Sequence, residues 1–150
     1  DEECFYSGPY RTGALVLCVA ADHPWADRAE VRLRDLVSER LIVREPTSGT
    51  RQIFHRALLD AAVTPRAVME IGSREAVHEA VAANLGVGVV AESEIRHDAR
   101  VRIIQISDAR LNITEYLVCL RERRRLGAVS AFVAITVELA DASASISAED

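Results

Sequence analysis

Short unbroken apolar runs alternate along the chain with stretches in which apolar residues recur every three or four positions. Unbroken runs of this length predict buried strands, and the wider spacing predicts helices. The predicted strands cover residues 14–21, 41–45, 67–71, 87–91, 101–106 and 115–120, and the predicted helices cover residues 33–37, 50–62, 73–85 and 129–140. Strands that alternate with helices are typical of an α/β protein built on a mainly parallel sheet.

The two ends of the chain differ in pattern from its middle. Residues 1–13 contain two glycines and a proline, which predict an irregular segment. Residues 141–150 are small, polar and acidic, so we expect a flexible tail there. Between the ends, the doubly apolar strands 14–21 and 114–120 bracket a unit of about ninety residues, a normal size for a compact domain.

The segment after strand 41–45 contains the main candidate site. Pro46 cannot donate to a strand ladder, so the strand should stop there, and small residues follow before the next helix: Thr47, Ser48, Gly49 and Thr50. The first turn of a helix has free backbone N–H groups and the positive end of the helix dipole, which together bind anions. The alternative interpretation is that Ser48 or Thr47 is an ordinary N-cap.

The helix expected at 73–85 has recognisable ends. Ser73 is a candidate N-cap, and Gly86 is placed to end the helix at its C′ position. The Gly86-Val87-Gly88 sequence follows a helix and enters a strand, which is the reverse of the order in a dinucleotide-binding turn, and the third glycine is missing. The two glycines therefore indicate a helix end and a close strand approach.

Composition excludes several classes of function. The chain of 150 residues is 49% hydrophobic and 27% charged, as globular domains are, and its net charge of −5 argues against direct contact with nucleic acid. The three cysteines form no CxxC pair, which argues against a disulfide framework or a zinc site and fits a reducing cytoplasm. Apolar runs are too short for a membrane span.

No catalytic constellation or cofactor motif is visible. The four histidines, His23, His55, His78 and His97, are scattered, and neither a Gly-x-Ser-x-Gly nor an HExxH motif occurs. We expect a binding module without a cofactor or a metal, and not an enzyme.

Four segments in this order resemble the effector-binding domain of LysR-type transcriptional regulators: Ala21 to Ala26, Leu33 to Glu45, Thr47 to Arg51 and Val81 to Val90. The resemblance covers roughly residues 14–137. In that family a glycine usually stands at the position of Asn84. The segments Ser73 to Val81 and Glu115 to Arg123 resemble more narrowly the branch associated with aminoethylphosphonate catabolism.

The resemblance implies an α/β fold like that of type II periplasmic binding proteins, with a ligand between two lobes. Residues 1–13 would lead in from a missing first lobe, and residues 14–120 would form the hinge strands and one Rossmann-like second lobe. Residues 121–140 would be a helix that returns to the first lobe, followed by the tail. The chain begins without Met, so it is expected to be a piece of a longer protein.

The resemblance also implies where the effector binds. Family members contact it through the loop that corresponds to Thr47, Ser48, Gly49 and Thr50, and Ala91 and Glu92 would face the same cleft. Arg51 would add a charge-assisted bond to a carboxylate or phosphonate. The alternative for Arg51 is a solvated arginine in the first turn of the helix.

The implied function is sensing of a small, anionic metabolite by a cytoplasmic regulator. DNA would be bound only through a helix-turn-helix domain absent from this chain, and the full-length protein would be a homo-oligomer. The alternative is a lobe of an extracytoplasmic solute-binding protein of the same fold.

Overall fold

Two units make up the chain. The computed structural model describes residues 4–95 and 97–146. The central unit is Gly13–Ile113, and the terminal unit combines Asp1–Thr12 with Thr114–Asp150. The division falls within the strands Phe5–Ala20 and Asn112–Leu120. No helix in the described residues is both long and apolar enough to cross a membrane.

The strands and helices follow the predicted order, except that the first strand starts earlier and a short strand at Glu30–Val31 was not predicted. The strands are β1 (Phe5–Ala20), β2 (Glu30–Val31), β3 (Arg40–Val43), β4 (Ala67–Glu70), β5 (Val87–Ala91), β6 (Val101–Ile106) and β7 (Asn112–Leu120). The α-helices are α1 (Gly49–Asp60), α2 (Arg74–Ala82) and α3 (Gly127–Ile146), and short 3-10 turns are η2 (Leu33–Ser38), η3 (Glu92–Glu94) and η4 (Arg121–Arg123).

The sheet has the strand order β2-β6-β1-β5-β3-β4, and β7 pairs with β1 outside this path. Strand β3 lies between β4 and β5 and is parallel to both, as the strand–helix alternation predicted. Strand β1 runs antiparallel to its neighbours β5 and β6. The sheet is thus parallel where helices connect consecutive strands, and β1 is the exception.

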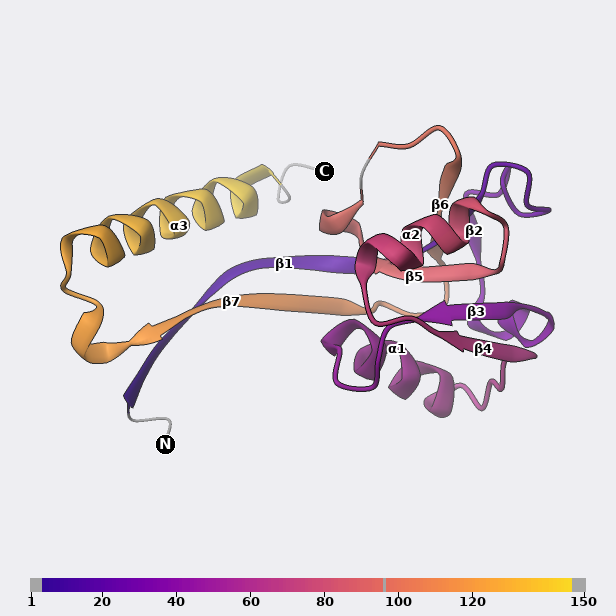
Figure 1. The fold of residues 1–150 in the computed structure, drawn as a ribbon, viewed down its shortest axis with the longest axis horizontal. Coiled ribbons are helices and arrows are strands. Elements are labelled where there is room, and N and C mark those ends of the chain that lie inside the picture. Colours follow the sequence, from indigo (N-terminus) through magenta and orange to yellow (C-terminus); the bar gives the residue numbers. More distant parts are fainter. Residues whose placement is uncertain (1–3, 96, 147–150) are drawn as a thin grey trace. The chain divides into compact units, whose positions relative to one another are not determined.

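Helices α1 and α2 cover opposite faces of the sheet in the central unit (Figure 1). Leu41 and Val43 of β3 belong to the core cluster beneath α1, whereas Ile42 belongs to the cluster beneath α2. Successive side chains of a strand point to opposite faces, so a strand covered on both sides must be apolar throughout. This double burial explains why the strand sequences are unbroken apolar runs.

Asn84, and not Gly86, is the left-handed residue that ends α2. Asn84 has φ 57°, its N–H donates to Val81 O at 2.8 Å, and Leu85 N–H donates to Ala80 O at 3.0 Å. These two bonds form a Schellman motif, in which asparagine is the commonest substitute for glycine. The prediction that Gly86 occupies the C′ position is therefore wrong by two residues.

Close backbone packing explains the two glycines after α2. A Cβ at Gly86 would clash with the carbonyl oxygen of Arg40 in the neighbouring strand. At Gly88 a Cβ would lie 2.6 Å from Val81 and 2.7 Å from the sulfur of Cys18. The predicted close strand approach is confirmed at Gly86, against the backbone of β3, and Gly88 leaves room for the side chains of Val81 and Cys18.

Strand β1 begins at Phe5, so the prediction of an irregular segment over 1–13 is wrong from Phe5 onward. Strand β7 supplies a pairing partner, and the side chains of Thr12 and Thr114 are hydrogen-bonded at 2.9 Å. Arg11 also pairs with Glu115, with one N–O distance of 3.1 Å. Long-range pairing overrides the local breakers, because strand preference depends strongly on context.

Helix α3 is longer than predicted. It runs from Gly127 to Ile146, so the tail expected over 141–150 is helical up to Ile146, and the remaining residues lie outside the described part. Val133 and Thr136 are buried, and the Thr136 hydroxyl donates to Phe132 O at 2.7 Å, which satisfies this buried polar group.

Candidate functional site

The carboxyl ends of the parallel strands β3, β4 and β5 form one edge of the sheet in the central unit. The strands end at Val43, Glu70 and Ala91, and α1 and α2 both begin at this edge. In open α/β sheets ligands bind outside the carboxyl ends of the strands. This edge is therefore the candidate ligand-binding region of the central unit.

The loop between β3 and α1 is held in place by its own helix. Arg51 donates to the carbonyl oxygen of Arg44 at 2.9 Å, and the side-chain amide of Gln52 donates to Pro46 O at 3.2 Å. Ser48 N–H closes the turn on Glu45 O at 3.0 Å. The loop is therefore preorganised, so ligand binding there does not require the free energy of ordering the loop.

The N-terminus of α1 is open. Ser48 occupies the N-cap position, but its side chain makes no capping bond, and the first turn contains no acidic residue. In the part of the chain that the structure describes, the hydroxyls of Thr47, Ser48 and Thr50 make no hydrogen bond. Ser48 thus occupies the N-cap position, as the ordinary-cap interpretation predicts, but its side chain does not make the capping hydrogen bond.

The N-terminus of α2, at the same edge, is closed. The Ser73 hydroxyl accepts a hydrogen bond of 3.1 Å from Ala76 N–H, as predicted, and Glu75 adds a negative charge to the first turn. Of these two helix ends, only that of α1 lacks both a side-chain cap and an acidic residue in its first turn.

Gly49 opens α1 without a packing reason for a glycine. A Cβ at this position would make only an ordinary contact, 3.7 Å from Cδ1 of Ile113, and the residue is exposed. The absence of a side chain here fits a site where a ligand approaches the backbone.

Arg51 is neither solvated nor directed at open space. Its side chain is 20% exposed, donates to Arg44 O and lies 3.9 Å from a carboxylate oxygen of Glu70. These two partners compensate for a positive charge in the first turn of α1, where the helix dipole opposes it. The structure thus places Arg51 as a support of the loop.

Ala91 and Glu92 end strand β5 at the same edge. Ala91 is fully buried in the core beneath α1, so only its backbone can meet a ligand. Glu92 begins the turn η3 and is exposed. Its carboxylate suits an ammonium or hydroxyl group and would repel an anion.

A small hollow of about 10 Å³ lies between the two helix starts, and sequence reasoning found only Thr50 of its lining. Arg44 and Arg74 line it too, each paired with a glutamate: Arg44 with Glu45 at 2.7 Å and Arg74 with Glu94 at 3.0 Å. The Arg44 guanidinium lowers the pKa of the Glu45 carboxyl. Ligand pockets occupy about 300–1,000 Å³, so the hollow can be only part of one.

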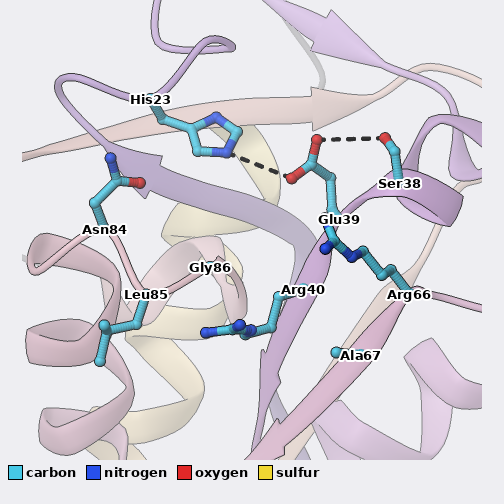
Figure 2. A pocket seen from close by; sticks show the side chains of 9 residues that line it. All are labelled: His23, Ser38, Glu39, Arg40, Arg66, Ala67, Asn84, Leu85 and Gly86. Atoms are coloured by element: carbon cyan, nitrogen blue, oxygen red, sulfur yellow. Dashed lines mark hydrogen bonds and ion pairs between the residues drawn. The ribbon is translucent and has the colours of Figure 1, made fainter.

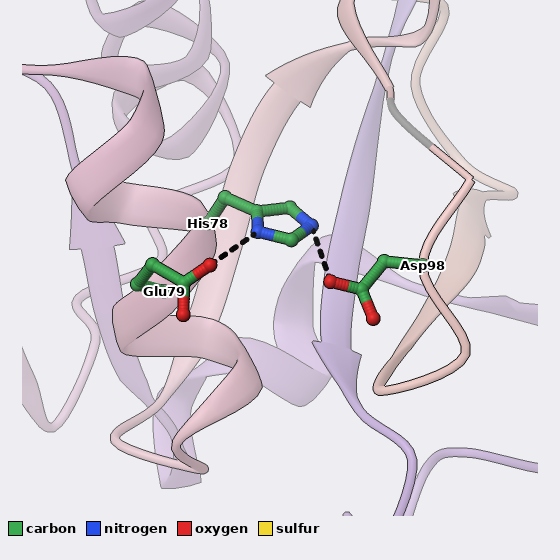
Figure 3. A group of neighbouring side chains, drawn as sticks. All are labelled: His78, Glu79 and Asp98. Carbon is green, nitrogen blue, oxygen red and sulfur yellow. Dashed lines mark ion pairs between the residues drawn. The ribbon is translucent and has the colours of Figure 1, made fainter.

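His78, Glu79 and Asp98 gather beside α2, a grouping that the scattered sequence positions did not reveal (Figure 3). Their ligand atoms lie within 4.8 Å of one another, as a metal site would require. However, the Arg100 guanidinium donates to Glu79 at 2.9 Å and to Asp98 at 2.7 Å. The cation that these carboxylates bind is therefore the arginine.

Comparison with known proteins places the chain in a family. Residues 3–141 match the model of the LysR substrate binding domain. An uncharacterized HTH-type transcriptional regulator of Methanocaldococcus jannaschii is 37% identical over 116 residues, 73% of this chain and 38% of the relative. The regulator CbbR of Xanthobacter flavus is 32% identical over 123 residues, 79% of this chain and 37% of the relative. The chain thus spans about two fifths of these relatives.

Solved structures agree on the fold. The regulatory domain of Synechocystis CcmR in complex with 2-PG matches 93% of this chain and 69% of that one, with 24% identity and a TM-score of 0.78. The effector binding domain of QuiR in complex with shikimate matches 94% of this chain and 68% of that one, with 21% identity and a TM-score of 0.79. The α/β fold like that of type II periplasmic binding proteins is confirmed, and the chain belongs to the LysR substrate binding domain family.

Proposed function

We propose that the chain senses a small metabolite whose anionic group binds at the open N-terminus of α1. The observation that carries the proposal is the uncapped first turn, with Thr47, Ser48 and Thr50 presenting unbonded hydroxyls around Gly49. Backbone N–H groups and the helix dipole favour a carboxylate, phosphate or phosphonate over a neutral group there.

The affinity must come mainly from hydrogen bonds. The helix dipole contributes about 0.3–1 kcal/mol, whereas each bond to a charged group contributes about 1.5–3 kcal/mol. Three or four such bonds from the first turn and the loop hydroxyls would reach micromolar binding, about 8 kcal/mol. The residues of the proposed contact are Thr47, Ser48, Gly49 and Thr50, with Ala91 through its backbone and Glu92 at the rim, and Arg51 acts by holding the loop.

Glu92 adds a second requirement to the proposed ligand. An exposed carboxylate near an anion site favours a molecule that also carries an ammonium or hydroxyl group. The narrower sequence resemblance makes 2-aminoethylphosphonate, which has both groups, a suitable first compound. CcmR and QuiR were solved with 2-PG and shikimate, which supports a small ligand for this chain.

The regulatory role of the whole protein is part of the proposal. Relatives of this chain are HTH-type transcriptional regulators, which favours a regulator over a solute-binding protein. In a longer protein, DNA binding would belong to a helix-turn-helix domain and dimer formation to the effector domains. The described chain would provide one wall of the ligand cleft.

A pair of isosteric probes tests the anion site. We expect acetate, but not acetamide, to shift the backbone amide NMR signals of residues 49–51 saturably, and 2-aminoethylphosphonate to do so at lower concentration. Gly49→Val should abolish these shifts, whereas Ser73→Val, at the closed end of α2, should leave them unchanged. Equal responses to acetate and acetamide would overturn the proposal, as would full binding by Gly49→Val.

A further inference from the structure

A second pocket lies at the opposite edge of the sheet, where the parallel strands begin (Figure 2). Its volume is about 290 Å³, far larger than the hollow beside Thr50. The residues that line it come from the turn after β1, the end of η2, the starts of β3 and β4, and the turn after α2: His23, Ser38, Glu39, Arg40, Arg66, Ala67, Asn84, Leu85 and Gly86.

Two arginines of this pocket have no partner. Arg40 is the first residue of β3, and Arg66 precedes Ala67, which is paired with Arg40 in the parallel register of β3 and β4. Over residues 4–95 and 97–146, neither guanidinium makes a hydrogen bond or an ion pair. Both arginines are exposed, and two cations on adjacent strands concentrate positive charge at one place.

Glu39, the carboxylate that lines the pocket, is held by other residues. Its oxygens lie 3.4 Å from the Ser38 hydroxyl and 3.6 Å from Nε2 of His23. Nδ1 of His23 accepts a hydrogen bond of 3.1 Å from Trp25 N–H, so the ring proton of a neutral His23 lies on Nε2, toward Glu39. These contacts position Glu39 beside the arginines without an ion pair to either of them.

The turn after α2 shapes the rest of the pocket. Asn84 is held in the left-handed conformation by the Schellman bonds of its backbone, and its side chain lies at the margin of the pocket (Figure 2). Leu85 is partly exposed and adds an apolar surface. The last carbonyls of α2 are engaged in the Schellman motif, so the arginines, and not a helix dipole, dominate the charge here.

We propose that this pocket is a second anion-binding site, distinct from the proposed effector site, that takes a small oxyanion such as a phosphate or a carboxylate. The Arg40 and Arg66 guanidiniums donate charge-assisted hydrogen bonds to the oxyanion, and the Asn84 amide donates a further one. The pocket and the α1 site stand at opposite ends of the same strands, so both can be occupied at once.

Phosphate titration of the 150-residue chain, followed by NMR, tests this site. At constant pH and ionic strength, inorganic phosphate should shift the Nε–Hε signals of Arg40 and Arg66 and the amide signals of residues 84–86 saturably. Succinate in a parallel titration shows whether carboxylates are accepted as well as phosphates. Arg40→Gln and Arg66→Gln should each weaken phosphate binding about tenfold, the loss of one strong charged hydrogen bond.

Two variants separate binding from folding. Arg34→Gln removes an exposed arginine of η2 outside the pocket and should leave phosphate binding within about twofold, as expected for a distant charge. Asn84→Gly keeps the left-handed conformation while removing the amide, and should weaken binding without destabilising the chain. Equal shifts with chloride, or unchanged phosphate binding in an Arg40→Gln, Arg66→Gln double variant, would overturn the proposal. Shifts at residues 49–51 report the other site, so failure of one proposal is distinguishable from failure of the other.

Discussion

The Arg51 guanidinium donates a hydrogen bond of 2.9 Å to the carbonyl oxygen of Arg44, seven residues earlier in the chain. This bond ties the first turn of α1 to the end of β3 and closes the loop that contains the proposed effector contacts. A half-buried arginine that bonds a backbone carbonyl stabilises a particular loop conformation, which is what a preorganised site requires.

Removing that bond should destabilise the central unit. We expect Arg51→Gln to lower the free energy of unfolding by about 1–2 kcal/mol, because a partly buried charged hydrogen bond is lost. Arg56→Gln is the matched control, since Arg56 pairs with Asp60 on the exposed face of α1 and such pairs contribute about 0.3–0.5 kcal/mol. Urea unfolding measures both changes, and equal losses in the two variants would show that Arg51 does not stabilise the loop.

The end of α1 offers a stabilising substitution. Ala62 has φ 53°, a left-handed conformation that is costly for a residue with a Cβ, and its N–H donates to Leu59 O at 3.0 Å in a Schellman motif. Ala62→Gly should raise stability by about 0.5–1 kcal/mol. Ala61→Gly, at a right-handed position with φ −84°, should lower it. Thermal unfolding that shows the same sign for both variants would contradict this prediction.

The two serines at helix starts should differ in their effect on stability. Ser73 caps α2, so Ser73→Ala should cost about 1 kcal/mol. Ser48 makes no capping bond, so Ser48→Ala should cost only a few tenths of a kcal/mol while weakening anion binding at α1. Denaturation curves and acetate titrations of both variants provide the measurement; a full capping loss at Ser48 would mean that the ordinary-cap interpretation is correct.

Lowering the pH should remove the contribution of Arg100 to the stability of the folded chain. Hydrogen bonds from Arg100 lower the pKa of Asp98 from its ordinary value of 3.8 to about 2 and also lower the pKa of Glu79. A carboxyl whose pKa is depressed by folding stabilises the folded state above its unfolded pKa and loses that effect as pH falls through the folded value. The stability difference between the natural chain and Arg100→Gln should therefore be constant near pH 7 and shrink between about pH 4 and pH 2. A pH-independent difference would rule out this linkage.

The apolar surface of α3 should promote self-association. Phe132, Ile135 and Leu139 of this helix are each more than half exposed. Large exposed apolar patches on soluble proteins mark interaction sites or cause aggregation. We expect sedimentation velocity to show weak self-association of the chain that decreases in a Phe132→Gln, Ile135→Gln variant but not in Leu59→Gln, which removes an exposed leucine of α1. A monomer at high concentration would contradict this expectation.

Local sequence determined much of the fold and the outline of the proposed site. The unbroken run Leu41 to Val43 predicted a buried strand because both of its faces are covered, and the Ser73 cap was predicted because a capping bond spans only three residues. The order of strand, small-residue loop and helix around Ser48 likewise placed a helix start at a strand end. Each of these features can be predicted from residues that lie within a few positions of one another in the sequence.

Tertiary structure decided what depends on distant partners. Strand pairing with β7 made Phe5 to Thr12 extended despite local breakers, and the need for a glycine at Gly86 comes from the backbone of Arg40 in the neighbouring strand. Whether Arg51 contacts a ligand or the backbone depends on where Arg44 O lies, and the pocket around Arg40 and Arg66 exists only because two strand starts are adjacent. Periodicity records which face of an element is buried, but it contains no information about which element covers that face.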